Sequence, residues 1–399
     1  MNPDLSRLKP YPFDQLNQLL DGVTPGAQPF ISLALGEPRH QPPDFIIEAF
    51  ANTGLLTEGV ATYPPTRGLP NLRAAIADFV RRRFSPADPD PDFHVLPVNG
   101  TREALFAIAQ TVCDPTSKPL TLLPNPFYQI YEGAALLAGT TPHYLPCGPE
   151  RGFQPDINAI SDDLWQRVGL IYLCNPGNPQ GALMSTETLQ AWISKALEHQ
   201  AVLVMDECYS EIYREETNPP PGLLQAAAMM GNKDFKQCLT FNSLSKRSNL
   251  PGLRSGFVAG DADLIRSFLL YRTYHGSAMP VHTQKISALA WQDDDHVRAN
   301  RAQYTAKIQD FVRVLAPFWP MQPPAASFYL WPETPINDLE FTQRLMRNCN
   351  IKVLPGQFLS RSVNGQNPGL NRVRLALVAD SDDCLEAANR IADNFQHLS

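Results

Sequence analysis

Side chains able to do acid–base and covalent chemistry follow four apolar segments of this sequence. The segments are residues 120–123, 170–174, 202–205 and 239–241. The groups that follow them are Tyr128, Asn178, Asp206 with Tyr209, and Ser243 with Ser245 and Lys246. Gathered in one place, an amide, a carboxylate, phenols, hydroxyls and an amine can bind a small polar molecule and exchange protons with it. Singly, each has an ordinary explanation as a turn residue, a helix cap, a packed ring or a solvated lysine, but their joint order favours a site.

Two further segments suit a phosphate group. Residues 99–103 stand where a helix begins, so free backbone N–H groups and the Thr101 hydroxyl would face an anion there, although an ordinary threonine cap is the alternative. The Ser-Leu-Ser-Lys segment is followed by Arg254, and two hydroxyls with a guanidinium suit a phosphate monoester better than a metal. The pattern predicts a phosphorylated cofactor attached to a lysine.

The elements that must position these groups form a repeating pattern. The four apolar segments are short, are bounded by turn residues and lack polar alternation, and residues 186–199 between two of them have a helical pattern. This succession is typical of parallel strands that are joined by crossover helices and covered on both faces. In such sheets, ligands bind at the carboxyl ends of the strands. The polar groups therefore belong at one edge of a parallel sheet.

The rest of the chain predicts a second, smaller α/β unit. Helices are expected at 14–20, 69–84 and 102–112, and a further strand at 255–259. After residue 285, the pattern predicts helix 297–315, strand 328–331, helix 339–349, strand 373–378 and helix 383–396. We expect an arm (1–30) that joins the small domain, a large domain (31–285) and a C-terminal small domain (286–399).

Composition excludes several classes of protein. Lys and Arg number 33 against 40 Asp and Glu, a net charge of −7, which argues against nucleic-acid binding; the basic run 81–83 fits a solvated helix end. Seven widely spaced cysteines and eight histidines show no zinc-type spacing, so no metal is expected. Proline is abundant, 38 residues against 23 glycines, yet the two together are too few for a disordered chain. No signal sequence or membrane-spanning stretch is apparent, so the expected location is the cytoplasm, away from membranes.

The segment 243–256, Ser-Leu-Ser-Lys-Arg-Ser-Asn-Leu-Pro-Gly-Leu-Arg-Ser-Gly, resembles the lysine signature of the class I and II aminotransferases of fold type I, which use pyridoxal 5′-phosphate (PLP). The similarity extends from Leu-Gly-Glu-Pro at 35–38 to the C-terminal strand. It implies a large domain with a mostly parallel, seven-stranded sheet, a smaller α/β domain, and a homodimer with shared active sites. Amino acids and 2-oxo acids are the implied substrates.

The resemblance also implies roles for individual residues. Lys246 matches the lysine that bonds to the cofactor, Asp206 the carboxylate at the pyridine nitrogen, and Tyr209 and Asn178 the donors to the ring oxygen, with Tyr128 stacked on the ring. The phosphate contacts correspond to Gly100, Thr101, Arg102, Ser243, Ser245 and Arg254, with Tyr63 reaching in from the other subunit. The substrate α-carboxylate would bind Arg374 and the Gly36 backbone, together with Asn178. Arg372 lies two residues from Arg374 on the same strand, so these two arginines could be exchanged in this alignment.

Segments 2–13, 245–254 and 271–280 are similar to bacterial succinyldiaminopimelate aminotransferases. That activity transfers an amino group between glutamate and N-succinyl-2-amino-6-ketopimelate in lysine and diaminopimelate biosynthesis. Such substrates carry a distal carboxylate, for which Arg39 and Arg272 are candidates, with surface salt bridges as the alternative role.

Other activities remain open to different degrees. A broader aspartate- or aromatic-type aminotransferase is the main alternative, and a C–S lyase on the same fold is less favoured. A DNA-binding regulator is disfavoured because only about 30 residues precede the family's core, too few for a helix-turn-helix domain. A non-catalytic scaffold is disfavoured because Lys246, Asp206 and Arg374 are all present.

Overall fold

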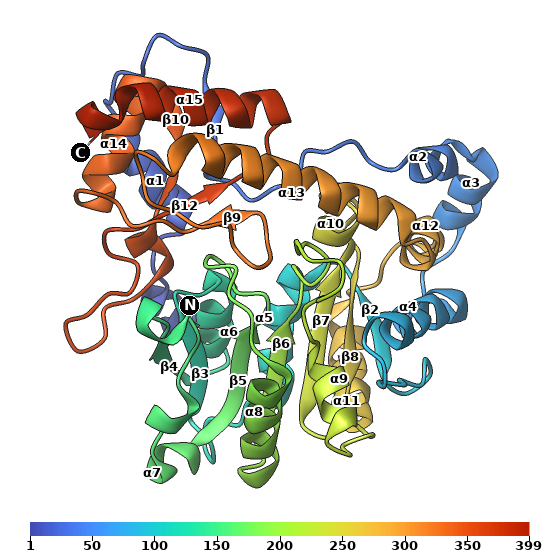
Figure 1. The fold of residues 1–399 in the computed structure, drawn as a ribbon. Helices are drawn as coiled ribbons and strands as arrows, with labels where there is room; N and C mark the ends of the chain where they lie inside the picture. The colour runs from blue at the N-terminus through green and yellow to red at the C-terminus, as the bar shows by residue number, and fades with distance from the viewer. Residues whose placement is uncertain (399) are drawn as a thin grey trace.

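A seven-stranded sheet forms the centre of the computed structural model, which describes residues 1–398 (Figure 1). Its strand order is β2-β8-β7-β6-β5-β3-β4. The strands are β2 (Val95–Val98), β3 (Leu120–Asn125), β4 (Thr141–Pro146), β5 (Val168–Cys174), β6 (Val202–Asp206), β7 (Cys238–Ser243) and β8 (Gly256–Gly260). All neighbouring pairs are parallel except those of β8, which runs antiparallel to β2 and β7. The predicted mostly parallel sheet is confirmed.

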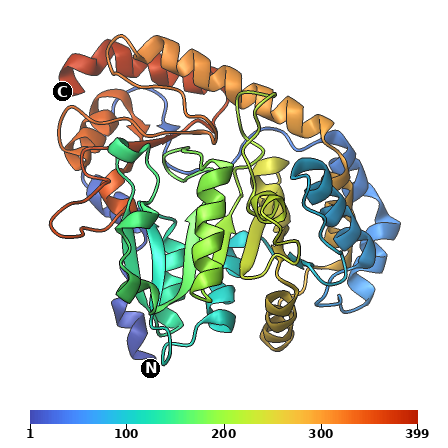
Figure 2. The same cartoon turned by 60° about the horizontal axis from the view of Figure 1, so that its bottom comes forward.

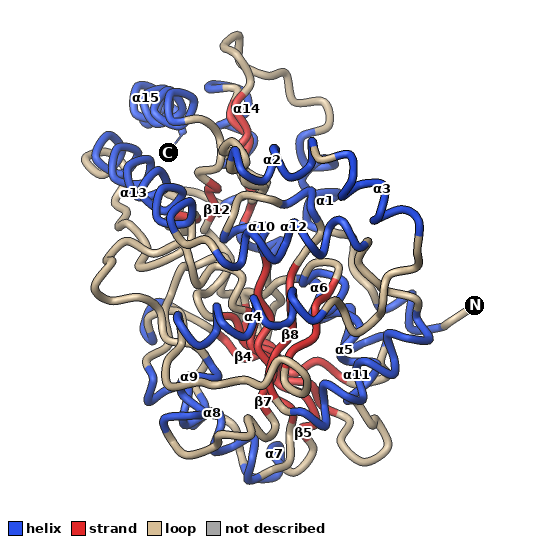
Figure 3. Tube along the Cα trace, turned by 90° about the vertical axis from the view of Figure 1, so that its right-hand side faces the viewer, coloured by secondary structure: helices blue, strands red, loops and turns tan. Residues whose placement is uncertain are grey.

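Helices cover both faces of this sheet, as Figure 3 shows. One face packs against α4 (Pro70–Arg83), α8 (Thr186–Glu198), α9 (Leu223–Met229) and α12 (Val281–Gln292). The other packs against α5 (Thr101–Val112), α6 (Gln129–Leu137) and α11 (Ala262–His275). Within β5, Ile171 and Leu173 enter the first core, whereas Leu170 and Tyr172 enter the second. Because both faces are buried, the central strands β3, β5, β6 and β7 are apolar at most positions.

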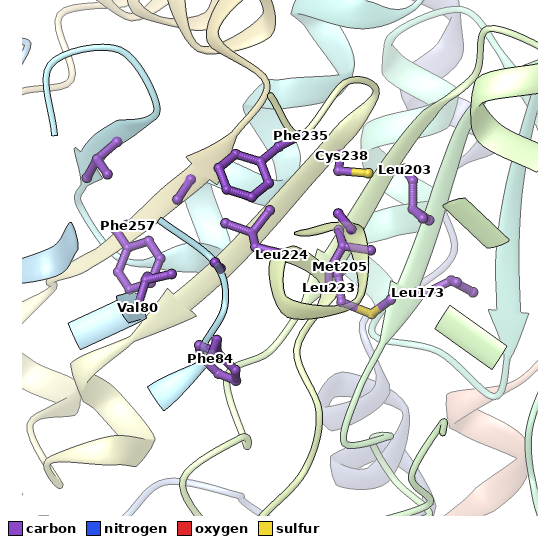
Figure 4. Close-up of a cluster of buried hydrophobic side chains, with 14 of the residues drawn as sticks. Val80, Phe84, Leu173, Leu203, Met205, Leu223, Leu224, Phe235, Cys238 and Phe257 are labelled. Carbon is purple, nitrogen blue, oxygen red and sulfur yellow. The ribbon is translucent and has the colours of Figure 1, made fainter. Parts of the chain in front are cut away.

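The first of these cores is drawn in Figure 4. Val80 of α4 lies beside Phe257 of β8, Phe84 belongs to the same core, and Leu203 and Met205 project into it from β6. None of these five side chains is more than 2% exposed. Full burial of each such side chain stabilises the fold by roughly 1.5–3 kcal/mol, so the sheet is a rigid base for the loops at its edge.

The C-terminal elements lie above the sheet in Figure 1 and form two smaller sheets. They are α13 (Asp295–Leu315), β9 (Tyr329–Leu330), α14 (Asp338–Cys349), β10 (Ile351–Lys352), β11 (Leu354–Pro355), β12 (Val373–Ala376) and α15 (Ser381–Leu398). One small sheet has the order β11-β12-β9, and the other pairs β1 (Ile31–Ser32) with β10. Every helix and strand predicted beyond residue 285 is present, with ends shifted by a few residues.

The N-terminal segment lies against these C-terminal elements. Helix α1 (Pro12–Leu20) contacts α14 and β11, and the strand pair β1–β10 is parallel. Helices α13 and α15, orange and red, extend along the top of the molecule in Figures 1 and 2. The domain limits at residues 30 and 285 stay a prediction, although β1 sits with the C-terminal elements.

The remaining helices are short. They are α2 (Asp44–Ala51), α3 (Thr53–Ala61), α7 (Asp162–Trp165), α10 (Leu244–Arg247) and the 3-10 turns η1 (Pro3–Arg7), η2 (Pro149–Arg151), η3 (Ile157–Ala159), η4 (Pro251–Leu253) and η5 (Gly356–Leu359). Helices α2 and α3 pack against α12. Within residues 1–398, no helix is long and apolar enough to cross a membrane, and no group of three His, Cys, Asp or Glu side chains could hold a metal ion.

Candidate active site

A cavity of about 610 Å³ opens at the carboxyl ends of the parallel strands. Its walls come from both the seven-stranded sheet and the β11-β12-β9 sheet. The predicted site residues that line it are Gly36, Thr101, Arg102, Tyr128, Asn178, Asp206, Tyr209, Ser243, Ser245, Lys246, Arg254 and Arg374. The volume lies within the range of about 300–1,000 Å³ that is usual for small-molecule sites. The structure therefore gathers almost all of the predicted residues around one cavity, both those at the strand ends and those that the family resemblance added.

Lys246 projects into this cavity from α10, the short helix that begins directly after β7. The Ser243 side chain caps that helix by accepting the Ser245 N–H at 3.1 Å. The Lys246 Nζ donates to the Gly36 carbonyl at 2.7 Å. Burial lowers the pKa of Lys246 from 10.5 to about 8. A lysine with so low a pKa is partly neutral near physiological pH, and the neutral amine is the nucleophilic form.

Asp206 ends β6 and is only 5% exposed. Its carboxylate accepts the Tyr131 hydroxyl at 2.7 Å and the Cys208 N–H at 3.1 Å. Burial raises the pKa of Asp206, and these hydrogen bonds oppose that rise. Among the described residues no side chain forms an ion pair with it. A buried carboxylate without a protein cation is costly, so a cationic ligand atom, such as a protonated ring nitrogen, would stabilise it.

Arg374, on β12, is the complementary case of a buried cation. Its Nη2 donates to the Ala34 carbonyl at 2.8 Å and its Nη1 to the Asn178 Oδ1 at 3.2 Å, while the buried Nε has no partner. No carboxylate within residues 1–398 pairs with this guanidinium, which is 5% exposed and lines the cavity. A ligand carboxylate would supply the missing anion.

Arg372 occupies a different environment. It bonds to the Trp331 carbonyl at 3.0 Å, pairs with Glu333 at 3.5 Å and does not line the cavity. Of the two arginines that the sequence left open, the geometry favours Arg374.

The region expected to hold phosphate combines a helix start with a close approach of two segments. Gly100 has φ +85°, and a β-carbon there would overlap the guanidinium of Arg254. Gly100 is the N-cap of α5, with no side-chain hydrogen bond to the helix, so the first-turn N–H groups are left for a ligand. The Thr101 hydroxyl contacts the Cys208 Sγ at 3.0 Å, so it does not cap the helix. The Ser243 Oγ donates to the Ser245 Oγ at 3.0 Å beside this turn.

Besides Arg372, four candidates lie outside the cavity lining. Tyr63 is fully exposed, and one chain alone does not bring it to the site. Arg39 is exposed and does not line the cavity. Arg272, 1% exposed, bonds to Glu103 at 2.7 and 3.0 Å, so it forms the salt bridge that was the alternative, although in the interior rather than on the surface. Gly100 does not line the cavity itself but precedes Thr101, which does.

Sequence reasoning missed several residues that complete the site. Tyr131 holds Asp206; it stands one helical turn after Tyr128, and the two rings meet edge-on at 5.7 Å. Tyr329 lies in the predicted strand 328–331 and bonds to the Tyr209 hydroxyl at 2.9 Å. Tyr11 lines the cavity from the N-terminal arm. The spacing of Tyr131 from Tyr128 could have identified it, but nothing near Tyr329 or Tyr11 in the sequence marks them as site residues.

Comparison with known families agrees with this geometry. The family model for aminotransferase class I and II matches residues 28–391. The chain belongs to the class I and II aminotransferases. Enzymes of this family depend on PLP and act as transaminases, so the predicted family, fold and cofactor are confirmed.

This aminotransferase is similar to relatives along almost its whole length. It is 28% identical over 393 residues to LL-diaminopimelate aminotransferase 2 of Trichormus variabilis, covering 98% of this chain and 97% of the relative. An aminotransferase from Neisseria meningitidis has a TM-score of 0.93 and 43% identity, with 100% of both chains covered. Aminotransferase AspB from Helicobacter pylori has a TM-score of 0.89 and 36% identity, covering 98% of this chain and 99% of that one.

The residues of the aminotransferase cavity fit PLP on physical grounds. Asp206 is a buried carboxylate without a cation, and Lys246 is an amine with a lowered pKa. The α5 N-terminus, two serine hydroxyls and Arg254 can bind a phosphate. The chemistry of the donors therefore matches a cofactor with a ring nitrogen, an aldehyde and a phosphate.

Proposed function

We propose that this aminotransferase transfers an amino group from a diaminopimelate-type donor to 2-oxoglutarate, with N-succinyl-L,L-2,6-diaminopimelate as the donor and N-succinyl-2-amino-6-ketopimelate and glutamate as the products. The observation that carries the transaminase chemistry is the unpaired, buried guanidinium of Arg374 in the same cavity as Lys246. An amino acid that binds Arg374 through its α-carboxylate would present its amino group and Cα to that lysine. The curated relatives named LL-diaminopimelate aminotransferases support the substrate class.

The cofactor would be held by residues from five segments. Lys246 would bond to it, Asp206 would pair with its ring nitrogen, and Tyr209 and Asn178 would donate to its ring oxygen, with Tyr128 against the ring. The phosphate contacts would come from Gly100, Thr101, Arg102, Ser243, Ser245 and Arg254. When bound, PLP withdraws electrons from the substrate Cα and so makes the Cα proton removable.

The chain's own residues would then orient the substrate and move one proton. Arg374, held by Asn178 and the Ala34 carbonyl, would grip the α-carboxylate through parallel hydrogen bonds, next to the backbone of Gly36. This grip fixes the direction in which the Cα–H bond points. Lys246, as a neutral amine, would take the proton at its Nζ and return it to the product carbon. Asp206, whose carboxylate accepts hydrogen bonds from Tyr131 and the Cys208 N–H, would favour the protonated state of the ring nitrogen.

The distal end of the substrate distinguishes two candidates. N-succinyl-diaminopimelate carries an acylated distal amine, whereas LL-diaminopimelate carries a free ammonium group, and the names of the curated relatives favour the second. Both have a distal carboxylate. Arg102 lines the cavity, stacks on Tyr11 at 5.3 Å and pairs with no carboxylate within residues 1–398, so it is a candidate for that group in place of its proposed phosphate contact. Arg272 forms an ion pair with Glu103, so we no longer propose it as a ligand of the distal carboxylate.

Single-turnover conversion of the PLP form with a panel of amino acids tests this proposal. We expect N-succinyl-diaminopimelate to react fastest, with 2-oxoglutarate then restoring the starting spectrum. Faster reaction with LL-diaminopimelate would make that compound, rather than N-succinyl-diaminopimelate, the proposed substrate. A clear preference for aspartate, an aromatic amino acid or a thioether would overturn the diaminopimelate assignment in favour of a broad aminotransferase or a C–S lyase.

We also propose that the enzyme is a homodimer in which Tyr63 reaches the phosphate site of the partner copy. Apolar side chains are exposed on α12 and on the two helices that pack against it and precede Tyr63 in the chain: Ile47 of α2 is 53%, Val60 of α3 77% and Leu289 of α12 42% exposed. A second copy of this chain would cover them.

Mixed dimers of Lys246→Ala and Tyr63→Phe subunits test the shared site, assayed at limiting PLP. If Tyr63 acts across the interface, each mixed dimer contains one intact site, and activity rises above that of either variant alone. No gain on mixing, with subunit exchange verified by a mass tag, would contradict the shared site.

A further inference from the structure

Tyr329 touches three residues of the proposed active site. Its hydroxyl lies 2.9 Å from the Tyr209 hydroxyl. Its ring lies under the Arg374 guanidinium, 4.4 Å from ring centroid to Cζ. At Gly36, a β-carbon would overlap the Tyr329 hydroxyl, so only glycine leaves room for it. Tyr329 is 2% exposed and lines the cavity.

These contacts join two separate parts of the fold. Tyr329 is in β9, which pairs with β12 in the small sheet, whereas Tyr209 follows β6 of the seven-stranded sheet. Backbone contacts beside the tyrosines fix this junction: the Ser327 N–H donates to the Ile212 carbonyl at 2.7 Å, and Tyr213 pairs with Ala326. The phenol pair is therefore held from both sides and is not a chance contact of two long side chains.

The two phenols share one hydrogen bond, so the direction of that bond matters. If Tyr329 donates, the Tyr209 oxygen accepts, and the Tyr209 proton is left to point into the cavity. A phenol that accepts a hydrogen bond is a stronger donor, because neighbouring hydrogen bonds polarise one another. Tyr329 is only 2% exposed, so the loss of its hydroxyl leaves the Tyr209 hydroxyl without this hydrogen-bond partner.

We propose that Tyr329 is a positioning residue that strengthens the Tyr209 donor toward the cofactor ring oxygen and supports Arg374 for substrate binding. The inference rests on the proposed function, in which Tyr209 and Arg374 hold those roles. Its hydroxyl acts on the cofactor through Tyr209, and its ring acts on the substrate carboxylate through a cation–π contact. Because Tyr329 lies in the small sheet, both effects depend on how the small sheet sits against the large one.

The two parts of the side chain can be removed separately. Tyr329→Phe keeps the ring and loses the hydroxyl, whereas Tyr329→Leu loses both. A donor to the ring oxygen favours the deprotonated form of the lysine-bound cofactor, so a weaker donor should raise the pH at which its visible absorbance changes. We expect a rise of about 0.3–1 pH unit for Tyr329→Phe, with KM for the amino acid changed less than about threefold. Tyr329→Leu should also raise KM by about 3–30-fold.

Tyr304 provides a matched control. It is 1% exposed, belongs to the same apolar cluster, does not line the cavity and has no partner for its hydroxyl. Tyr304→Phe therefore removes a buried hydroxyl beside the site without touching Tyr209, and its absorbance titration should match wild type. Thermal unfolding of each variant checks that it is folded.

The outcomes separate this inference from the proposed function. An unshifted titration for Tyr329→Phe, or an equal shift for Tyr304→Phe, overturns the role of Tyr329 while leaving the transaminase intact. If Lys246→Ala retains the visible absorbance of the wild type, the proposed site itself is wrong, whatever Tyr329 does.

Discussion

Arg272 donates through one nitrogen to both carboxylate oxygens of Glu103, at 2.7 and 3.0 Å. The same carboxylate accepts the backbone N–H of Asn99 at 3.0 Å, one residue before Gly100. Arg272 is 1% exposed, so this pair fixes the turn that precedes α5 from inside the protein. It also neutralises a negative charge that would otherwise stand beside the proposed phosphate site.

We predict that Arg272→Gln weakens binding of PLP by at least about tenfold, because Glu103 is left uncompensated next to a dianion. Binding of pyridoxal, which has no phosphate, should change little. The double variant with Glu103→Gln removes both charges and should recover most of the PLP affinity. Equilibrium titration of cofactor-free protein measures all three, and equal losses for PLP and pyridoxal would indicate general damage rather than an effect on the phosphate turn.

The same pair shows where reasoning from sequence reaches its limit. Arg272 could be recognised as a cation, but its partner lies 169 positions away, and nothing local identifies Glu103 as that partner. Tyr329 could not be recognised as a site residue for the same reason, because its contacts with Tyr209 and Gly36 join residues that are far apart in the sequence. Lys246 and Asp206 could be placed from their positions after two apolar segments, and their roles could be proposed because segment 243–256 resembles the signature of a known family.

Some strands of the large sheet could be predicted from the sequence, and others could not. β3, β5, β6 and β7 are apolar runs buried on both faces, so composition alone identifies them. The edge strand β4 escaped recognition because it has two prolines and is largely unburied, and β2 because it is four residues long and includes Pro97. Proline is tolerated in such positions because an edge strand leaves some N–H groups unused.

The turn at Gly100 offers a second prediction. Alanine there would meet two penalties, a φ of +85° and an overlap with the Arg254 guanidinium. Gly231 isolates the first, since its φ is +89° and nothing lies within 4 Å of a β-carbon. We expect Gly231→Ala to lower the free energy of unfolding by about 1–2 kcal/mol without altering PLP affinity. Gly100→Ala should lose PLP affinity as well, measured by the same titration. Equal PLP affinities for the two variants would contradict a steric role for Gly100.

The low pKa of Lys246 makes the stability of the cofactor-free enzyme depend on pH. The folded protein releases this proton near pH 8, whereas the unfolded chain holds it to about 10.5. Between these values the unfolded state binds more protons, so the free energy of unfolding rises with pH. Below pH 8 the buried amine is charged, and the full cost of burying that charge lowers the free energy of unfolding.

We therefore expect the free energy of unfolding of wild type, minus that of Lys246→Met, to be constant from pH 6 to about 7.5 and to rise toward pH 9.5. Urea unfolding of both cofactor-free proteins provides the measurement. A difference that stays flat across this range would mean that Lys246 titrates at its ordinary pKa.

Arg374 and Arg372 allow the substrate site to be tested with an internal control. They stand two residues apart, both are largely buried, and only Arg374 lacks an anionic partner and lines the cavity. Lysine keeps the charge but loses the planar fork that holds a carboxylate through two hydrogen bonds.

Arg374→Lys should therefore raise KM for both the amino acid and the 2-oxo acid by about 10–100-fold, the equivalent of one or two charge-assisted hydrogen bonds. Arg372→Lys should change either KM less than about threefold, because Glu333 and the Trp331 carbonyl occupy it. Steady-state kinetics with both substrates decide the point: equal effects of the two substitutions would mean that Arg374 supports the fold, and a larger effect at Arg372 would reverse the assignment.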